Sequence, residues 1–268
     1  MDIQVNGHQT YAYTGGKAFN PALPTVVLIH GVLCDHSVWA LQSRYLANHG
    51  WNVLAIDLPG HCRSAGAPPA SVQEAALFIQ ALLDALGVHQ AALVGHSFGS
   101  LIAMQAAANM GERISHLVMV GTAYPMKVSQ PLLDASLNEP EKALHMTNVF
   151  SRATLAPPSG AGAWVFGASL ALGRRVLASN PKVNVFHTGF NACNSYGQGL
   201  QAMAAVTCPV LMVLGESDQM TTPKNAQPLI TQAKESGKAL QVKLIPHGHH
   251  QMSESPDETL DALINFLR

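Results

Sequence analysis

Short apolar runs recur along the chain and alternate with stretches whose apolar residues return every three or four positions. Six runs have the length of a strand, at residues 25–29, 53–56, 91–94, 117–120, 210–214 and 240–245. A short apolar run that ends at a turn signal is typical of a strand buried on both faces, as in a parallel sheet. Residues 1–13 alternate weakly between apolar and polar positions around Gly7, which predicts an edge hairpin.

Helical patterns lie between these predicted strands. Residues 72–86 place their apolar side chains on one face, with Ser71 as the N-cap and Gly87 just past the C-terminus. Residues 257–267 repeat the pattern behind Pro256. Strands that alternate with helices predict an α/β fold, in which a mostly parallel central sheet carries helices on both faces.

One long segment breaks this alternation. Residues 123–205 contain no clear strand pattern and many Ala, Gly, Pro, Asn and Met residues. Because a structureless loop of this length is improbable inside a compact domain, we expect a mostly helical insertion there. The core is then built from residues 1–122 and 206–268.

Composition narrows the classes of function. The chain has 268 residues, of which 48% are hydrophobic and 12% charged, and this hydrophobicity excludes a disordered chain. Lys and Arg number 15 against 16 Asp and Glu, so no positive charge excess favours nucleic-acid binding. No apolar stretch reaches the roughly 18 residues of a membrane span, and the N-terminus lacks a signal-peptide pattern. With four cysteines and no C-x-x-C spacing, we expect a cytoplasmic protein. We also expect a monomer or a homodimer.

The clearest chemical motif is Gly95-His96-Ser97-Phe98-Gly99, which matches G-x-S-x-G. It follows a predicted buried strand and opens a helical pattern. A turn this sharp brings backbones so close that only glycine fits at its two outer positions. The serine then lies at a helix N-terminus, where backbone N–H groups favour negative charge. A tight strand-to-helix turn with an incidental serine is the alternative interpretation.

With these residues the chain resembles the α/β-hydrolase family over nearly its whole length. Four further segments match the family's motifs in the right order, namely an oxyanion loop at 30–32, a D-x-P-G-x-G-x-S turn at 57–64, an acid turn at 215–218 and a terminal histidine loop at 248–256. Cys62 departs from the pattern, because the family has glycine there, and this puts the backbone angles of the turn in question. The resemblance implies an α/β-hydrolase fold with a serine nucleophile and a helical cap, similar to bacterial members of unsettled substrate.

A serine nucleophile needs a base to take its proton and an acid to orient that base. The resemblance implies that Ser97 is the nucleophile. For the acid, Glu216 and Asp218 both follow the run at 210–214. The resemblance favours Asp218, because the family's acid lies a few residues past that strand, and Glu216 is interpreted as a solvated loop residue. An exposed turn carboxylate is the alternative interpretation of Asp218.

For the base, His247, His249 and His250 compete. The resemblance favours His249, which alone has Gly before it and the family's Glu-x-Pro spacing after it. A zinc site on His247 and His249 is disfavoured, because the chain lacks the further Asp-His of H-x-H-x-D-H hydrolases and catalytic zinc usually has three protein ligands. We therefore expect no metal and no cofactor. His30 and His96 flank the site and are interpreted as hydrogen-bonded structural histidines.

The resemblance also implies an oxyanion hole made by the backbone N–H groups of Phe98 and Val32, with Leu33 as the near alternative to Val32. The candidates for the substrate pocket are Leu33, Trp164, Tyr196 and Met220. We expect an apolar pocket with few charged anchors, while most apolar side chains of the insertion form a core of their own.

Together these features predict an enzyme that cleaves a small or medium apolar ester or lactone through an acyl-enzyme. Its partner would be a small-molecule substrate. A C–C bond hydrolase, an acyltransferase or a perhydrolase would use the same three residues. A small-molecule receptor and an idle structural protein that retain the fold are the rival interpretations outside catalysis. Serine rather than aspartate at position 97 argues against an epoxide hydrolase or haloalkane dehalogenase.

Overall fold

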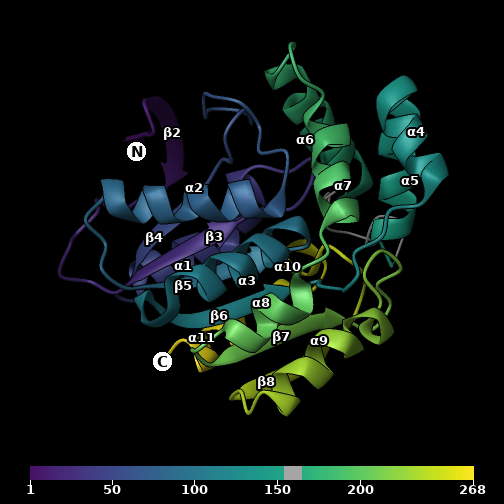
Figure 1. The fold of residues 1–268 in the computed structure, drawn as a ribbon. Helices are drawn as coiled ribbons and strands as arrows, with labels where there is room; N and C mark the ends of the chain where they lie inside the picture. The colour runs from purple at the N-terminus through teal and green to yellow at the C-terminus, as the bar shows by residue number, and fades with distance from the viewer. Residues whose placement is uncertain (154–164) are drawn as a thin grey trace.

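An eight-stranded sheet forms the centre of the molecule in a computed structural model that describes residues 1–153 and 165–268 (Figure 1). Its order is β1-β2-β4-β3-β5-β6-β7-β8. β1 and β2 form an antiparallel hairpin, β2 pairs antiparallel with β4, and the other neighbours are parallel. The strands are β1 (Asp2–Val5), β2 (His8–Tyr13), β3 (Thr25–Ile29), β4 (Asn52–Ile56), β5 (Ala91–His96), β6 (Ile114–Val120), β7 (Val210–Gly215) and β8 (Leu240–Ile245).

The predicted α/β fold is confirmed. The six apolar runs correspond to β3 through β8, and the predicted edge hairpin corresponds to β1 and β2. β3, β4, β5 and β7 are buried along their whole length, as expected for strands covered on both faces. β8 differs, because it is an edge strand and leaves Val242 and Leu244 exposed.

Helices cover both faces of the sheet. One face packs against α2 (Val72–Ala85), α3 (Phe98–Met110), α8 (Gly199–Ala205) and α9 (Pro223–Glu235), and Figure 1 views the sheet from this side. The opposite face packs against α1 (Ala40–Asn48) and α11 (Pro256–Phe266). Short helices complete this part, namely the 3-10 turns η1 (His36–Trp39) and η2 (Gly111–Arg113) and the single turn α10 (Gln251–Glu254). The predicted N-cap is present, since the hydroxyl of Ser71 accepts the N–H of Glu74 at 3.1 Å.

The chain between β6 and β7 is helical wherever the structure describes regular elements. Besides α8, it contains α4 (Gln130–Asn138), α5 (Pro140–Ser151), α6 (Val165–Ser179) and α7 (Val185–Ser195), which stand together beyond one end of the sheet (Figure 1). These four helices share an apolar cluster that includes Leu144, Val176 and Phe186, and Leu33 joins it from the loop after β3. α8 instead packs on α3.

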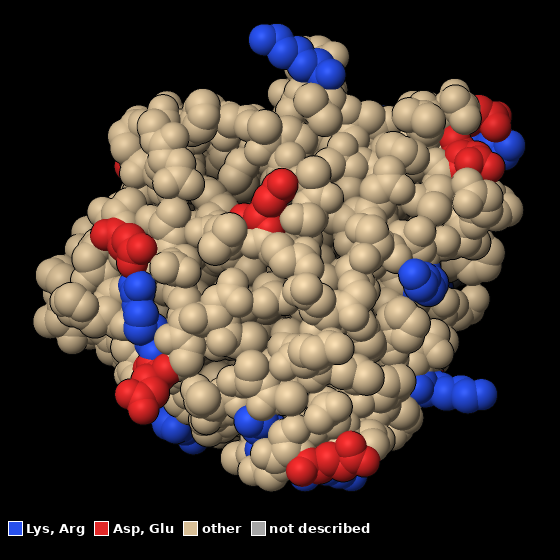
Figure 2. Space-filling model, viewed as in Figure 1, with Lys and Arg blue, Asp and Glu red and all other residues tan. Residues whose placement is uncertain are grey.

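Charged side chains are sparse on the surface. On the face shown in Figure 2, they lie singly or in small groups of mixed sign among uncharged residues. None of the described helices is long and apolar enough to cross a membrane.

Candidate active site

The turn between β5 and α3 places Ser97 at the carboxyl end of the central parallel strands. Ser97 adopts a φ of 53° and a ψ of −119°, a left-handed conformation that is costly for a residue with a Cβ. A Cβ on Gly95 would lie 2.0 Å from the carbonyl oxygen of Gly99, and a Cβ on Gly99 would lie 2.4 Å from that of Ile29. Both glycines are therefore required by close backbone approach, as the motif indicates.

The loop after β7 carries Asp218, which contacts His249 from the loop after β8. The Nδ1–H group of His249 donates to Asp218 Oδ2 at 2.9 Å. The side chain of Thr221 donates to the same oxygen, while the backbone N–H groups of Met220 and Thr221 donate to Oδ1, each at 2.8 Å. Asp218 and His249 are both buried.

The charged form of Asp218 is favoured in this environment. Burial acts to raise the pKa of Asp218, but the attraction to a protonated His249, the hydrogen bond from His249 and the donors of Thr221 outweigh it. The pKa of Asp218 therefore lies below its ordinary value, and the group is a carboxylate at neutral pH. A carboxylate that accepts from Nδ1 keeps the proton of the neutral imidazole on that nitrogen and leaves Nε2 free to accept.

Glu216 and His247 lie away from the cavity that Ser97 lines, whereas His250 also lines it, with its ring 5.9 Å from that of His249. Glu216 is exposed. His247 is exposed as well, and its Nδ1 forms a hydrogen bond with the hydroxyl of Ser255 at 2.8 Å. His250 is half-buried, and burial together with the charge of Arg152 lowers its pKa well below the ordinary value. The structure thus brings together Ser97, Asp218 and His249.

Two further histidines fix the loops of the site. The Nε2–H group of His96 donates to the carbonyl oxygen of His249 at 2.8 Å. Burial and the charge of His249 lower the pKa of His96 to about 3, so this ring is neutral. His30 accepts the backbone N–H of Leu58 at Nε2, at 3.1 Å, and donates from Nδ1 to the carbonyl oxygen of Gly31 at 2.8 Å. These contacts agree with their interpretation as hydrogen-bonded structural residues.

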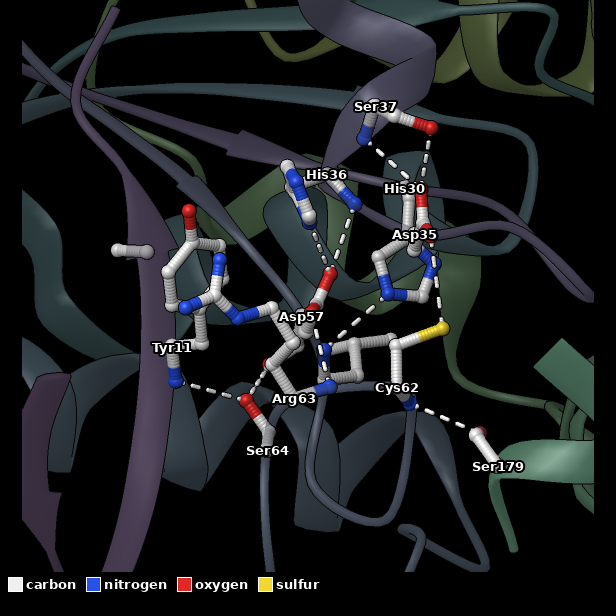
Figure 3. Close-up of polar contacts among 12 residues, drawn as sticks. Tyr11, His30, Asp35, His36, Ser37, Asp57, Cys62, Arg63, Ser64 and Ser179 are labelled. Atoms are coloured by element: carbon white, nitrogen blue, oxygen red, sulfur yellow. Dashed lines mark hydrogen bonds and ion pairs between the residues drawn. The ribbon is translucent and has the colours of Figure 1, made fainter. Parts of the chain in front are cut away.

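Two buried carboxylates hold the loop after β3 that contains Val32 and Leu33 (Figure 3). Asp57 accepts the backbone N–H of His36 at 2.9 Å and its Nδ1–H at 2.7 Å. Asp35 accepts the backbone N–H of Ser37 at 2.9 Å and pairs with Arg175 at 2.5 Å. Because every oxygen of the two carboxylates already accepts a hydrogen bond, this cluster is explained as a structural anchor rather than as a metal site.

The turn at Cys62 has the backbone conformation of a glycine although a cysteine stands there. Cys62 keeps a left-handed backbone, with a φ of 44°. Its N–H donates to the hydroxyl of Ser179 in α6 at 2.9 Å, and its thiol lies 3.4 Å from Asp35 (Figure 3). Burial, and then the charge of Asp35, raises the pKa of this thiol to about 12. The turn therefore keeps the conformation of a glycine at the cost of local strain.

Two cavities meet at Ser97 and His249. The larger has a volume of about 630 Å³ and extends between α5, α6 and the loop after β3, and the smaller has about 250 Å³ and lies beside α4. Val32 and Met220 line both cavities, and Leu33 lines the larger.

The other two predicted pocket residues are Tyr196 and Trp164. Tyr196 lies in the core next to α3, where its hydroxyl donates to Gln105 Oε1 at 2.8 Å, and it lines neither cavity. Trp164 lies outside the described residues.

The sequence reasoning did not single out Arg152, which lines the larger cavity and is only 6% exposed. It follows α5 directly and is one of 15 cationic residues in the chain, with no motif around it. Its position depends on how α5, α6 and α10 dock, so no local signal in the sequence distinguishes it.

Comparison with known proteins identifies the family. The family model described as alpha/beta hydrolase fold matches residues 24–161, and a model described as serine hydrolase (FSH1) matches residues 160–253. Lipase LipV of Mycobacterium tuberculosis is 33% identical over 128 residues, which are 47% of this chain and 48% of that protein, so the match spans about half of the lipase.

Two other proteins are similar over almost the whole chain. The 2-succinyl-6-hydroxy-2,4-cyclohexadiene-1-carboxylate synthase of Salmonella paratyphi B is 26% identical and is aligned over 92% of this chain and 95% of that protein. The crystal structure of the enol-lactonase from Burkholderia xenovorans LB400 superposes with a TM-score of 0.81 at 19% identity, over 100% of this chain and 99% of that one. Since the first family model covers half of the sequence and the fold agrees with it, the chain belongs to the α/β-hydrolase fold family.

Proposed function

We propose that the protein is a serine hydrolase that cleaves a small or medium ester or lactone, with Ser97 as nucleophile, His249 as base and Asp218 as the orienting acid. The observation that carries this proposal is the buried hydrogen bond of 2.9 Å between Asp218 and His249 beside a cavity that Ser97 also lines. The order of the α/β-hydrolase motifs along the sequence supports the same assignment of Ser97, Asp218 and His249.

The proposed reaction passes through an acyl-enzyme. His249 Nε2 accepts the Ser97 proton as Ser97 Oγ bonds to the substrate carbonyl carbon, and Asp218 stabilises the resulting imidazolium. The backbone N–H groups of Val32 and Phe98 then bind the oxyanion of the tetrahedral intermediate. Its collapse breaks the bond to the leaving oxygen, which takes the proton from His249. Water then bonds to the acyl carbon as His249 takes its proton, the bond from that carbon to Ser97 Oγ breaks, and His249 returns the proton to Ser97.

We also propose that the segment 123–205 covers the site as a cap. α5, α6 and α7 each contribute residues to the larger cavity, so their packing decides which substrates fit. The names of the lipase and the enol-lactonase are consistent with an ester or lactone as substrate.

Covalent labelling and an ester panel test the proposal together. A fluorophosphonate is expected to add one phosphonyl group at Ser97, located by peptide mass spectrometry, and the protein is expected to hydrolyse p-nitrophenyl esters of increasing acyl length. Ser97→Ala and His249→Ala should abolish turnover. His247→Asn is the matched control, because His247 is exposed, has a φ of 75° that asparagine tolerates, and contacts Ser255 instead of the site.

The same experiment separates the alternatives. Ester turnover that survives Ser97→Ala would refute the assigned nucleophile. Labelling of Ser97 without turnover of any ester would instead favour a C–C bond hydrolase, an acyltransferase, a perhydrolase or a receptor. An unlabelled Ser97 and no turnover would overturn the proposed function.

A further inference from the structure

The larger cavity contains a buried cation that no carboxylate neutralises. Arg152 is only 6% exposed, and no Asp or Glu of the described residues lies within ion-pair distance of its guanidinium. The sequence of residues 154–164, Thr-Leu-Ala-Pro-Pro-Ser-Gly-Ala-Gly-Ala-Trp, contains neither Asp nor Glu. Buried charges are ordinarily paired, so a lone arginine beside a cavity needs an explanation.

The acidic side chain whose charge acts on Arg152 is that of Glu254, and both of its oxygens already accept other hydrogen bonds. Glu254 accepts the backbone N–H of His250 at one oxygen, at 3.1 Å, and that of Ala153 at the other, at 3.0 Å. Its charge acts on Arg152 only from beyond ion-pair distance. Glu254 therefore fixes the loop around His250 and does not neutralise the guanidinium.

Neutral serines hold the guanidinium in place. Its Nη1 donates to the hydroxyl of Ser253 at 3.0 Å, and its Nη2 donates to the hydroxyl of Ser169. The Nε–H group has no acceptor among the described residues. A guanidinium has five N–H groups, so this arrangement orients the fork and leaves donors free for an acceptor.

The preceding residue, Ser151, carries a second unpaired polar atom. The hydroxyl of Ser151 is buried and has no hydrogen-bond partner among the described residues, and Ser151 lines the same cavity. The carbonyl oxygen of Ser151 accepts the backbone N–H of His249 at 2.8 Å, which ties this segment directly to the proposed base. The charge of Arg152 also lowers the pKa of His96 and of His250, so it lies within electrostatic range of the rings around His249.

We infer that Arg152, with the hydroxyl of Ser151, binds a carboxylate of the substrate, so that the preferred substrate is an ester or lactone that carries a second, anionic carboxylate group. That the bound molecule is cleaved rests on the proposed function, whereas the binding of a carboxylate at Arg152 does not depend on the reaction. The remaining lining is mostly apolar, including Leu144, Leu172 and Phe186, so the carbon chain between the two carbonyl groups lies against apolar side chains. Arg152 is a positioning residue in this scheme, and it acts by fixing the substrate rather than by proton transfer.

A matched pair of substrates tests the inference. One is the mono-p-nitrophenyl ester of adipic acid, and the other is the same ester with the free carboxylate replaced by a carboxamide of equal size. The wild-type protein should favour the anionic ester by roughly 10- to 100-fold in kcat/KM, as expected for a hydrogen-bonded charge in a buried site. Arg152→Gln should reduce this ratio to about one, mainly by raising KM for the anionic ester. Arg152→Lys, which keeps the charge but not the fork, should give an intermediate ratio.

Arg174→Gln is the control for the loss of one positive charge. Arg174 lies in α6 like the contact Ser169, but it is exposed, pairs with Glu141 on the surface and does not line the cavity. This variant should keep the wild-type ratio. A wild-type ratio near one, or equal losses for both esters in Arg152→Gln, would overturn the inference while Ser97 labelling still upheld the proposed function.

Binding without turnover keeps the two proposals distinguishable. If Ser97 is not labelled and neither ester is cleaved, the proposed function fails, and calorimetry with adipate and adipamide then decides the anion site. Adipate binding that is lost in Arg152→Gln and kept in Arg174→Gln would support the site. Equal binding of adipate and adipamide, or binding of neither, would refute it.

Discussion

Replacing Asp218 by Asn tests how the proposed base is oriented. In the wild type, Asp218 Oδ2 accepts from His249 Nδ1 at 2.9 Å and from the hydroxyl of Thr221 at 2.8 Å, while Oδ1 accepts two backbone N–H groups. The backbone donors fix the amide oxygen of Asn at the Oδ1 position, so its NH₂ group faces His249. The NH₂ group of Asn and the Nδ1–H group of His249 would then face each other as two donors. The neutral imidazole therefore adopts the tautomer with its proton on Nε2, so that Nδ1 accepts from the amide. The imidazole can no longer accept the proton of Ser97.

The expected loss follows from this change of tautomer. The same substitution in a Ser-His-Asp arrangement lowers kcat by about 10⁴-fold, which corresponds to roughly 5 kcal/mol of transition-state stabilisation. Steady-state hydrolysis of p-nitrophenyl butyrate measures kcat, and thermal unfolding checks that the fold is intact. Glu216→Gln serves as the control, because Glu216 is exposed on the same loop and should leave kcat unchanged. If Asp218→Asn keeps more than a tenth of the wild-type kcat, or if Glu216→Gln shows the large loss, the assignment of the acid is wrong.

Three further predictions concern stability and reactivity. Gly99→Ala places a Cβ 2.4 Å from a backbone oxygen, so thermal or urea unfolding should show a loss of about 3 kcal/mol or more, and a loss under 1 kcal/mol would contradict the close approach. Asp35 has its pKa lowered to about 2 because the donors of Ser37 and Arg175 outweigh its burial. Its ionisation therefore contributes about 2 kcal/mol above the unfolded pKa near 4, and this contribution is lost as the pH falls towards 2. In Asp35→Asn, urea unfolding should show that loss at pH 7 and little difference from the wild type at pH 2, whereas a constant difference would contradict the linkage. Burial of Cys34, Cys193 and Cys208 and partial burial of Cys62 raise the pKa of all four thiols. Iodoacetamide should therefore modify the native protein slowly at pH 8 and all four cysteines rapidly in guanidinium, as counted by mass spectrometry. Fast labelling of the native protein would contradict the raised pKa values.

Local patterns in the sequence were sufficient for the fold. Each predicted strand is a short apolar run that is buried once neighbouring strands and helices cover it. The length and composition of the run therefore identify the strand without knowledge of how the helices pack on the sheet. The bounds differ by a few residues, as at β6, which begins at Ile114 rather than at 117. The strand extends past the apolar run because Ile114 and His116 also pair with β5, and the register shifts at Ser115 between them.

The grouping of Ser97, Asp218 and His249 was expected from the family resemblance, and the fold gives a physical reason for it. Each lies in a turn directly after a parallel strand, and the carboxyl ends of parallel strands meet at one edge of a sheet. Short connections leave little freedom in where such residues lie once the strand order is given. The position of Tyr196 was not predictable in this way, because it follows α7, whose residues pack partly on α3 and partly on the helices beyond the sheet.

Arg152 shows where reasoning from the sequence ends. Its surroundings come from three places in the chain, namely the end of α5, Ser169 in α6 and Ser253 in α10, and none of these contacts leaves a spacing pattern. An isolated cation of this kind opposes folding, because its burial costs free energy that two serine hydroxyls offset only in part. Burial accordingly lowers the pKa of Arg152 relative to a free arginine, although the group stays charged. In a chain with so few charges, a buried cation that lines the same cavity as the proposed nucleophile is best explained by a ligand that completes its hydrogen bonds. The pair of adipate esters tests the charge of that ligand directly.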